Sequence, residues 1–123
     1  MYKAFYMKEI EQIYCNDFGV AFYWKKSGIV LYDKVQVIFR ETGFYLTYNE
    51  IAEFSYIINN INESTECSAC EKINKNCKLL LKTPFEGLEM AVSQNELLDI
   101  KDLIEGALFK IRLKQYLSEA GRN

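Results

Sequence analysis

Residues 34–61 read KVQVIFRETGFYLTYNEIAEFSYIINNI, and residues 78–117 follow the same plan. Each stretch holds an apolar run, a turn, a second apolar run and a polar tetrapeptide: Thr47-Tyr48-Asn49-Glu50 in the first, Ser93-Gln94-Asn95-Glu96 in the second. In such a tetrapeptide the hydroxyl accepts from a backbone N–H one turn on, and the glutamate accepts from the first residue's N–H, which makes a capping box. The sequence therefore predicts two ββα units.

Turn residues separate the apolar runs that we expect to be strands. Gly43 offers a positive φ between residues 35–39 and 44–46, and residues 83–87 form the corresponding turn between 78–82 and 88–92. Upstream, Lys25-Lys26-Ser27-Gly28 joins residues 18–24 to 29–32, which predicts a hairpin. Residues 33–34 either turn the chain or bulge one long strand. The first 15 residues fit a strand or a short helix.

Each helix carries apolar residues at helical spacing. The first is expected over residues 48–61, with a buried stripe at Ile51, Phe54, Ile57, Ile58 and Ile61. The second is expected to bury a longer stripe, extended by Tyr116 and Leu117: Leu97, Ile100, Leu103, Ile104, Ala107, Leu108 and Ile111.

Gly106 interrupts the second helix, and a glycine there costs about 1 kcal/mol relative to alanine. It indicates either close packing or an exposed, tolerated glycine.

These elements predict one α+β domain over residues 1–123, a two-layer structure in which a mostly antiparallel sheet has two helices on one face. The other face of such a sheet is uncovered. Most aromatic residues lie before residue 49, more than one face of four short strands needs. We therefore expect a homo-oligomer, a dimer in the simplest case, in which the aromatic-rich strands pair with another subunit.

The composition of the chain bears on its cellular location but does not indicate a binding partner. Hydrophobic residues make up 50% of the chain, charged residues 26%, and the net charge is -2. The apolar stretches fall short of the roughly 20 residues that span a bilayer, so no membrane partner is expected. Charges interrupt the first ten residues as a secretion signal would not allow, which predicts a cytoplasmic protein with reduced or metal-bound cysteines.

The chain contains no histidine, which excludes Ser-His-Asp and Cys-His catalysis within one subunit. Its six glycines form neither a Walker loop nor a dinucleotide fingerprint. The sequence thus offers no catalytic set and favours a protein that is not an enzyme.

Cys67-Ser68-Ala69-Cys70 is the one chemical motif, within a polar connection over residues 62–76. Two thiolates at this spacing suit a tetrahedral zinc, with Cys77 and Cys15 as further candidate ligands. Ordinary reduced thiols are the simpler interpretation, because a second Cys-x-x-Cys is absent. Thiol redox chemistry is less favoured, since Glu66 and Glu71 would raise a thiol pKa rather than lower it.

Tyr23-Trp24-Lys25-Lys26, with Arg40 and Tyr45 nearby, has the composition of a stacking platform for single-stranded nucleic acid. One dibasic pair after a strand more often marks a solvated hairpin end, so nucleic acid is not expected as a partner.

Residues 34–39, the segment 46–51 with Phe54, and Leu88-Glu89-Met90 with Glu96-Leu97 and Ala107 resemble a family of small uncharacterised bacterial proteins found mostly in Bacteroidetes. The resemblance spans about residues 28–117. Members carry a Cys-x-x-Cys before the strand that matches residues 34–39, where this chain has Leu31-Tyr32-Asp33-Lys34. The resemblance implies the fold and assigns no activity.

Two functions follow as hypotheses. The first is a non-enzymatic cytoplasmic module that acts through self-association or protein binding. The alternative is a structural zinc or thiol-redox protein that uses Cys67 and Cys70.

Overall fold

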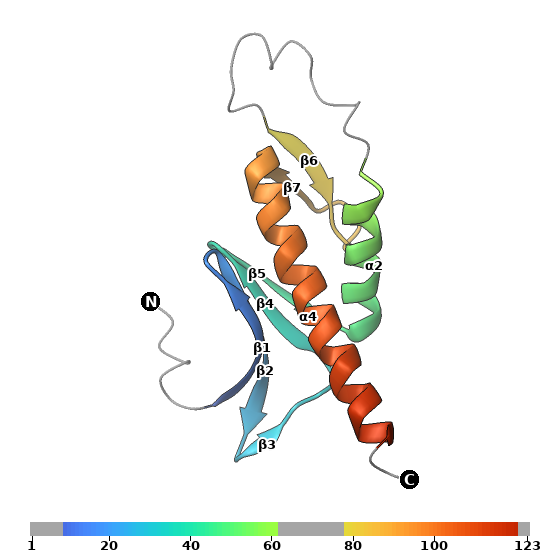
Figure 1. Ribbon diagram of the computed structural model, residues 1–123. Helices are drawn as coiled ribbons and strands as arrows, with labels where there is room; N and C mark the ends of the chain where they lie inside the picture. The colour runs from blue at the N-terminus through green and yellow to red at the C-terminus, as the bar shows by residue number, and fades with distance from the viewer. Residues whose placement is uncertain (1–8, 62–77, 121–123) are drawn as a thin grey trace.

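The computed structural model describes residues 9–61 and 78–120. Within them an antiparallel sheet forms one layer and two helices, α2 (Tyr48–Asn59) and α4 (Gln94–Ala120), form the other. Figure 1 shows α4 crossing the sheet with α2 beside it. The prediction of an α+β two-layer fold is confirmed.

The large sheet has the strand order β1-β2-β4-β5, and the short strand β3 pairs with the end of β2. All of its pairings are antiparallel. The strands are β1 (Ile10–Asn16), β2 (Gly19–Lys26), β3 (Ile29–Val30), β4 (Val35–Phe39) and β5 (Thr42–Leu46). The described part of the first segment is therefore a strand.

The predicted hairpin is β2 and β3, and its turn places Ser27 at φ 52° and Gly28 at φ 79°. Two consecutive positive φ values match the right-handed twist of a two-residue hairpin. After β3 the chain bulges at residues 31–34 and resumes beside β2 as β4, so that Val30 lies opposite Lys25 and Gln36 opposite Phe22. Of the two alternatives at residues 33–34, a bulge in one long strand describes the pairing better.

Both capping boxes are present. The Thr47 hydroxyl accepts from the Glu50 N–H at 3.1 Å, and the Glu50 carboxylate accepts from the Thr47 N–H at 2.8 Å. At the start of α4 the Ser93 hydroxyl accepts from the Glu96 N–H at 3.1 Å, and Glu96 accepts from the Ser93 N–H at 2.9 Å. The tetrapeptides that predicted two ββα units thus begin both described helices.

Glu96 also forms two ion pairs at the start of α4. Its carboxylate lies 3.2 Å from Arg40 Nε and 3.1 Å from Lys78 Nζ. The hydrogen bond from the Ser93 backbone and the one from Lys78 hold the pKa of Glu96 below its usual value. One carboxylate therefore caps the helix and ties it to both units.

The second unit differs from the first in its strands. Its strands β6 (Leu79–Lys82) and β7 (Glu89–Val92) form a separate two-stranded sheet and do not join the large one. Leu81 and Val92 face the helices and are buried, so the hairpin covers the helices rather than extending the sheet edge.

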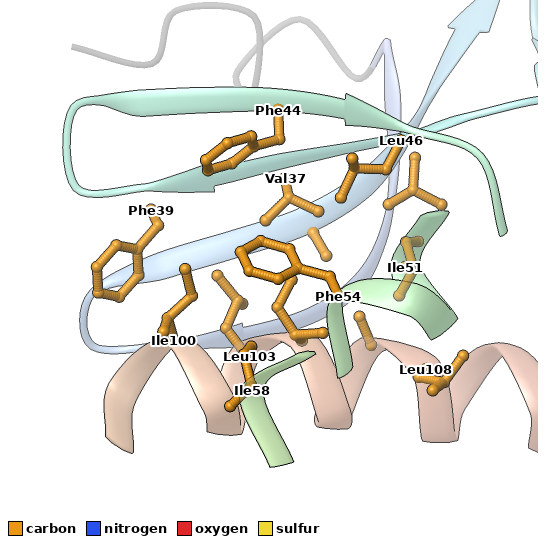
Figure 2. Packing of buried hydrophobic residues seen from close by; sticks show 14 of the residues in the cluster. Val37, Phe39, Phe44, Leu46, Ile51, Phe54, Ile58, Ile100, Leu103 and Leu108 are labelled. Carbon is orange, nitrogen blue, oxygen red and sulfur yellow. The ribbon is translucent and has the colours of Figure 1, made fainter. Parts of the chain in front are cut away.

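One hydrophobic cluster joins both layers. Figure 2 shows Val37 and Phe44 of the sheet pointing toward Phe54 of α2 and Leu103 of α4. The Phe44 and Phe54 rings meet edge to face, with centroids 5.8 Å apart. The predicted α4 stripe, which we call the inner stripe, is confirmed at all of its core positions, each of them buried: Leu97, Ile100, Leu103, Ile104, Ala107, Leu108 and Ile111.

The prediction that Tyr116 and Leu117 extend this stripe is wrong, because both are exposed, at 68% and 58%. Positions one turn and two turns beyond Ile111 on the same face are Lys114, Gln115 and Ser118. The apolar side chains at the end of α4 therefore lie on another face.

Strand β1 is fixed to α4 by one compact junction. Tyr14 donates its hydroxyl to both carboxylate oxygens of Asp102 at 3.0 Å, and the Asn16 amide donates to Asp102 and to the Asp99 carbonyl at 3.0 Å. A Cβ added at Gly106 would lie 2.6 Å from Tyr14 Cδ2. Gly106 is therefore a close-packing glycine, the first of its two interpretations.

Replacing Ser93 or Thr47 with alanine should lower the free energy of unfolding by about 0.5–2 kcal/mol, because a backbone donor at the helix start loses its acceptor. Ser93→Ala should cost at least as much as Thr47→Ala, since α4 holds more of the core. Asn95→Ala, an exposed change in the same first turn, is the control and should stay within about 0.5 kcal/mol. Denaturant midpoints equal to the parent in both cap variants would contradict the capping role.

Gly106→Ala should destabilise the protein by about 1–3 kcal/mol, because the new methyl group overlaps the Tyr14 ring. In a Tyr14→Ala background the same change should stabilise α4 by about 1 kcal/mol through helix propensity alone. Urea unfolding of the four proteins measures both values. An equal effect of Gly106→Ala in both backgrounds would show that the ring contact has no energetic weight.

Candidate functional site

A groove of about 760 Å³ lies beside the C-terminal part of α4. Figure 1 shows the connection from β3 to β4 approaching α4 there. The groove walls come from β1, β2, that connection and both helices. Its apolar and aromatic lining includes Ile13, Tyr23, Tyr32, Tyr48, Leu113 and Leu117.

Aromatic rings and one ion pair shape this groove. Tyr23 and Tyr32 meet edge to face with centroids 4.9 Å apart. Lys114 Nζ lies 3.0 Å from Glu11 Oε2 and 5.4 Å from the Tyr32 ring centroid. The hydrogen bond to Glu11 raises the pKa of Lys114, and burial raises the pKa of Tyr23. At neutral pH the groove therefore holds an uncharged phenol and a lysine whose charge is balanced.

The other end of the groove is fixed by a contact between the helices. Arg112 Nε donates to the Tyr48 hydroxyl at 2.9 Å, with the guanidinium 6.0 Å from the Tyr48 ring centroid. Because Asn59, at the far end of α2, donates to Glu105, the two helices run antiparallel. These two hydrogen bonds join α2 to α4, and the one at Tyr48 lies beside the groove.

A second surface runs along the side of α4 opposite the inner stripe, and its charged members contact β1 and α2 at its two margins. We call it the outer row. Its members recur every three or four residues, so they fall in one line along the helix. Five are exposed and Glu105 is half-buried: Leu98, Asp102, Glu105, Phe109, Arg112 and Tyr116.

The three apolar side chains of the outer row are largely exposed to solvent. Leu98 is 63% exposed, Phe109 61% and Tyr116 68%. Phe109 and Tyr116 are seven residues apart and Leu98 precedes Phe109 by eleven, both separations that return to one side of a helix. Sequence reasoning missed this surface because it followed the inner stripe. The signal was present in the apolar residues that fall off that stripe.

The predicted metal ligands are only partly within the structure. Cys15 lies on β1, exposed, with its sulfur accepting from the Gln12 amide at 3.4 Å. Cys67, Cys70 and Cys77 lie outside the described residues. Within residues 9–61 and 78–120 no three cysteine, aspartate or glutamate residues gather as metal ligands.

The residues considered for nucleic-acid stacking do not form one platform. Tyr23 and Trp24 are neighbours on β2, so their side chains point to opposite faces of the sheet. Tyr23 is buried in the core, and Trp24 donates to the Gln36 side chain at 3.2 Å. Arg40 is paired with Glu96, and Lys34 lies over the Tyr45 ring.

The aromatic side chains on the strands are mostly covered by the chain itself. Tyr23, Phe39 and Phe44 are buried in the core between the layers, and Phe22, on the other face of the sheet, is buried as well. Among the aromatic side chains of the strands, Tyr45 stays 42% exposed, less than Phe109 and Tyr116 of the outer row.

Comparisons with family models, curated proteins and solved structures found no match to this chain. The resemblance to the family of small bacterial proteins thus stays a prediction. Neither described helix is long and apolar enough to cross a membrane.

Proposed function

We propose that this protein is a small non-enzymatic module of the cytoplasm that acts through self-association or protein binding, with the outer row of α4 as its contact surface. The observation that carries the proposal is the exposure of Leu98, Phe109 and Tyr116 along one side of a helix whose other side is buried in the core.

Exposed apolar side chains in a continuous patch mark interaction sites more often than isolated ones do. Phe109 and Tyr116 form such a patch together with the exposed Leu113, whereas Leu98 lies apart, beyond Asp102 and Glu105. Covering apolar area stabilises a complex by about 25 cal/mol per Å², so three large side chains in one line offer a substantial gain to a partner. Leu113 and Leu117 continue the apolar surface from the outer row toward the groove. A partner on the outer row would therefore find further apolar contacts beside it.

The polar clusters of the described residues also support a non-enzymatic role. Asp102 accepts from Tyr14 and Asn16, Glu96 caps α4 and pairs with Arg40 and Lys78, and Lys114 pairs with Glu11. Each of these groups connects two elements of the fold. Their contacts account for their placement without a reaction.

Cytoplasmic placement rests on the sequence alone, in which charges interrupt the first ten residues.

Sedimentation velocity of the full chain from low to high micromolar concentration should show a reversible shift to a species of twice the monomer mass. Phe109→Ser should reduce that shift, because it removes an exposed apolar side chain from the proposed contact surface. Ile29→Ser, a similarly exposed apolar residue on β3, is the control and should leave the association unchanged. A strict monomer at every concentration would contradict self-association.

Elemental analysis of protein purified without added metal tests the alternative. A structural zinc on Cys67 and Cys70 requires about one zinc per chain, and a chelator would then destabilise the protein. Our proposal expects zinc well below stoichiometry and a melting temperature that a strong chelator leaves unchanged. Stoichiometric zinc would favour the metal-binding hypothesis instead.

A further inference from the structure

We infer that two copies of this chain pair antiparallel through the outer rows of their α4 helices, related by a two-fold axis at the level of Ala107. This inference rests on the proposed function, because it presupposes self-association, and it adds the partner, the surface and the orientation.

Two of the three pairs that this two-fold axis brings together are complementary. In an antiparallel pair centred on residue 107, Leu98 lies opposite Tyr116 of the second copy, Asp102 opposite its Arg112, and Glu105 opposite its Phe109. The end pair is apolar and the Asp102–Arg112 pair has opposite charges, whereas the innermost pair sets the half-buried Glu105 beside Phe109 and contributes no such match. A two-fold interface requires complementary pairs of this kind, since each copy presents the same patch.

The order of charges selects the orientation. Acidic residues lie in the first half of the outer row, at Asp102 and Glu105, and its basic residue, Arg112, lies in the second half. A parallel pair in register would place Asp102 opposite Asp102 and Arg112 opposite Arg112, both repulsive. The antiparallel pair brings the Asp102 carboxylate of each copy toward the Arg112 guanidinium of the other and so disfavours the parallel alternative.

The contacts made within one chain leave this pairing open. Arg112 uses Nε for the Tyr48 hydroxyl, so its two terminal nitrogens remain for a carboxylate of the second copy. Asp102 receives the Tyr14 hydroxyl on both oxygens and the Asn16 amide on Oδ2, which leaves about one of the roughly four acceptor positions of a carboxylate. Exposed ion pairs contribute little, so the charges set orientation and the apolar ends supply affinity.

The end contacts of the row give the sharpest test. Leu98→Glu and Tyr116→Lys each place a charge opposite an apolar side chain of the second copy, and each should weaken dimer formation by about tenfold or more. In the double variant, the introduced glutamate of one copy would face the introduced lysine of the other, in the orientation that the native charges favour. The double variant should therefore recover most of the lost association. Leu80→Glu, at a leucine on β6 that is 64% exposed, is the matched control and should associate like the parent.

Sedimentation equilibrium measures the dimer dissociation constants of the parent and its variants, and circular dichroism melting confirms that each one folds. Both changed positions are exposed, so folding should persist. A monomeric parent would overturn both the inference and self-association. A dimeric parent that neither single variant weakens would overturn the inference alone, leaving an interface elsewhere. A double variant weaker than either single one would show that the two residues do not face each other.

Discussion

The burial of the inner stripe of α4 holds the other elements of this protein together. Leu103, Ile104 and Ala107 are wholly inaccessible, and around them α4 contacts strands of the large sheet, the second hairpin and α2. No other described element meets both sheets and the other helix so extensively. Because most helical stability comes from packing an amphipathic face, α4 and its neighbours stabilise one another.

Two polar devices fix the position of this packed helix. At its start, Glu96 caps the backbone and pairs with cations from both units. Near its middle, Tyr14 and Asn16 of β1 reach Asp102, and Gly106 lets the Tyr14 ring lie directly against the helix. Hydrogen bonds need particular distances and angles, so these contacts add directional constraints to the apolar packing of the helix. The shape of the groove and the placement of the outer row depend on this position of α4.

The change of face near Ile111 extends the candidate contact surface, which already includes Leu98 and Phe109, to the end of α4. Up to Ile111 the apolar residues of the inner stripe face the core, and beyond it the core-facing positions are Lys114, Gln115 and Ser118. Tyr116 joins Leu98 and Phe109 on the side opposite the inner stripe. The same helix thus serves the core with its inner side and offers an apolar row on its outer side. That division is the basis on which we propose an interaction module.

The local features of this protein follow from its sequence alone. Both capping boxes, the Ser27-Gly28 turn and the inner stripe depend on hydrogen bonds and periodicity within a few residues, so reading the chain was enough to predict them. The contacts between distant segments required the folded chain: the separate β6–β7 hairpin, Tyr14 against Gly106, and Glu11 beside Lys114. A local pattern shows which side chains are apolar but not what covers them. The apolar members of the outer row are exposed because no described segment packs over them, and a single sequence without its fold does not contain that information.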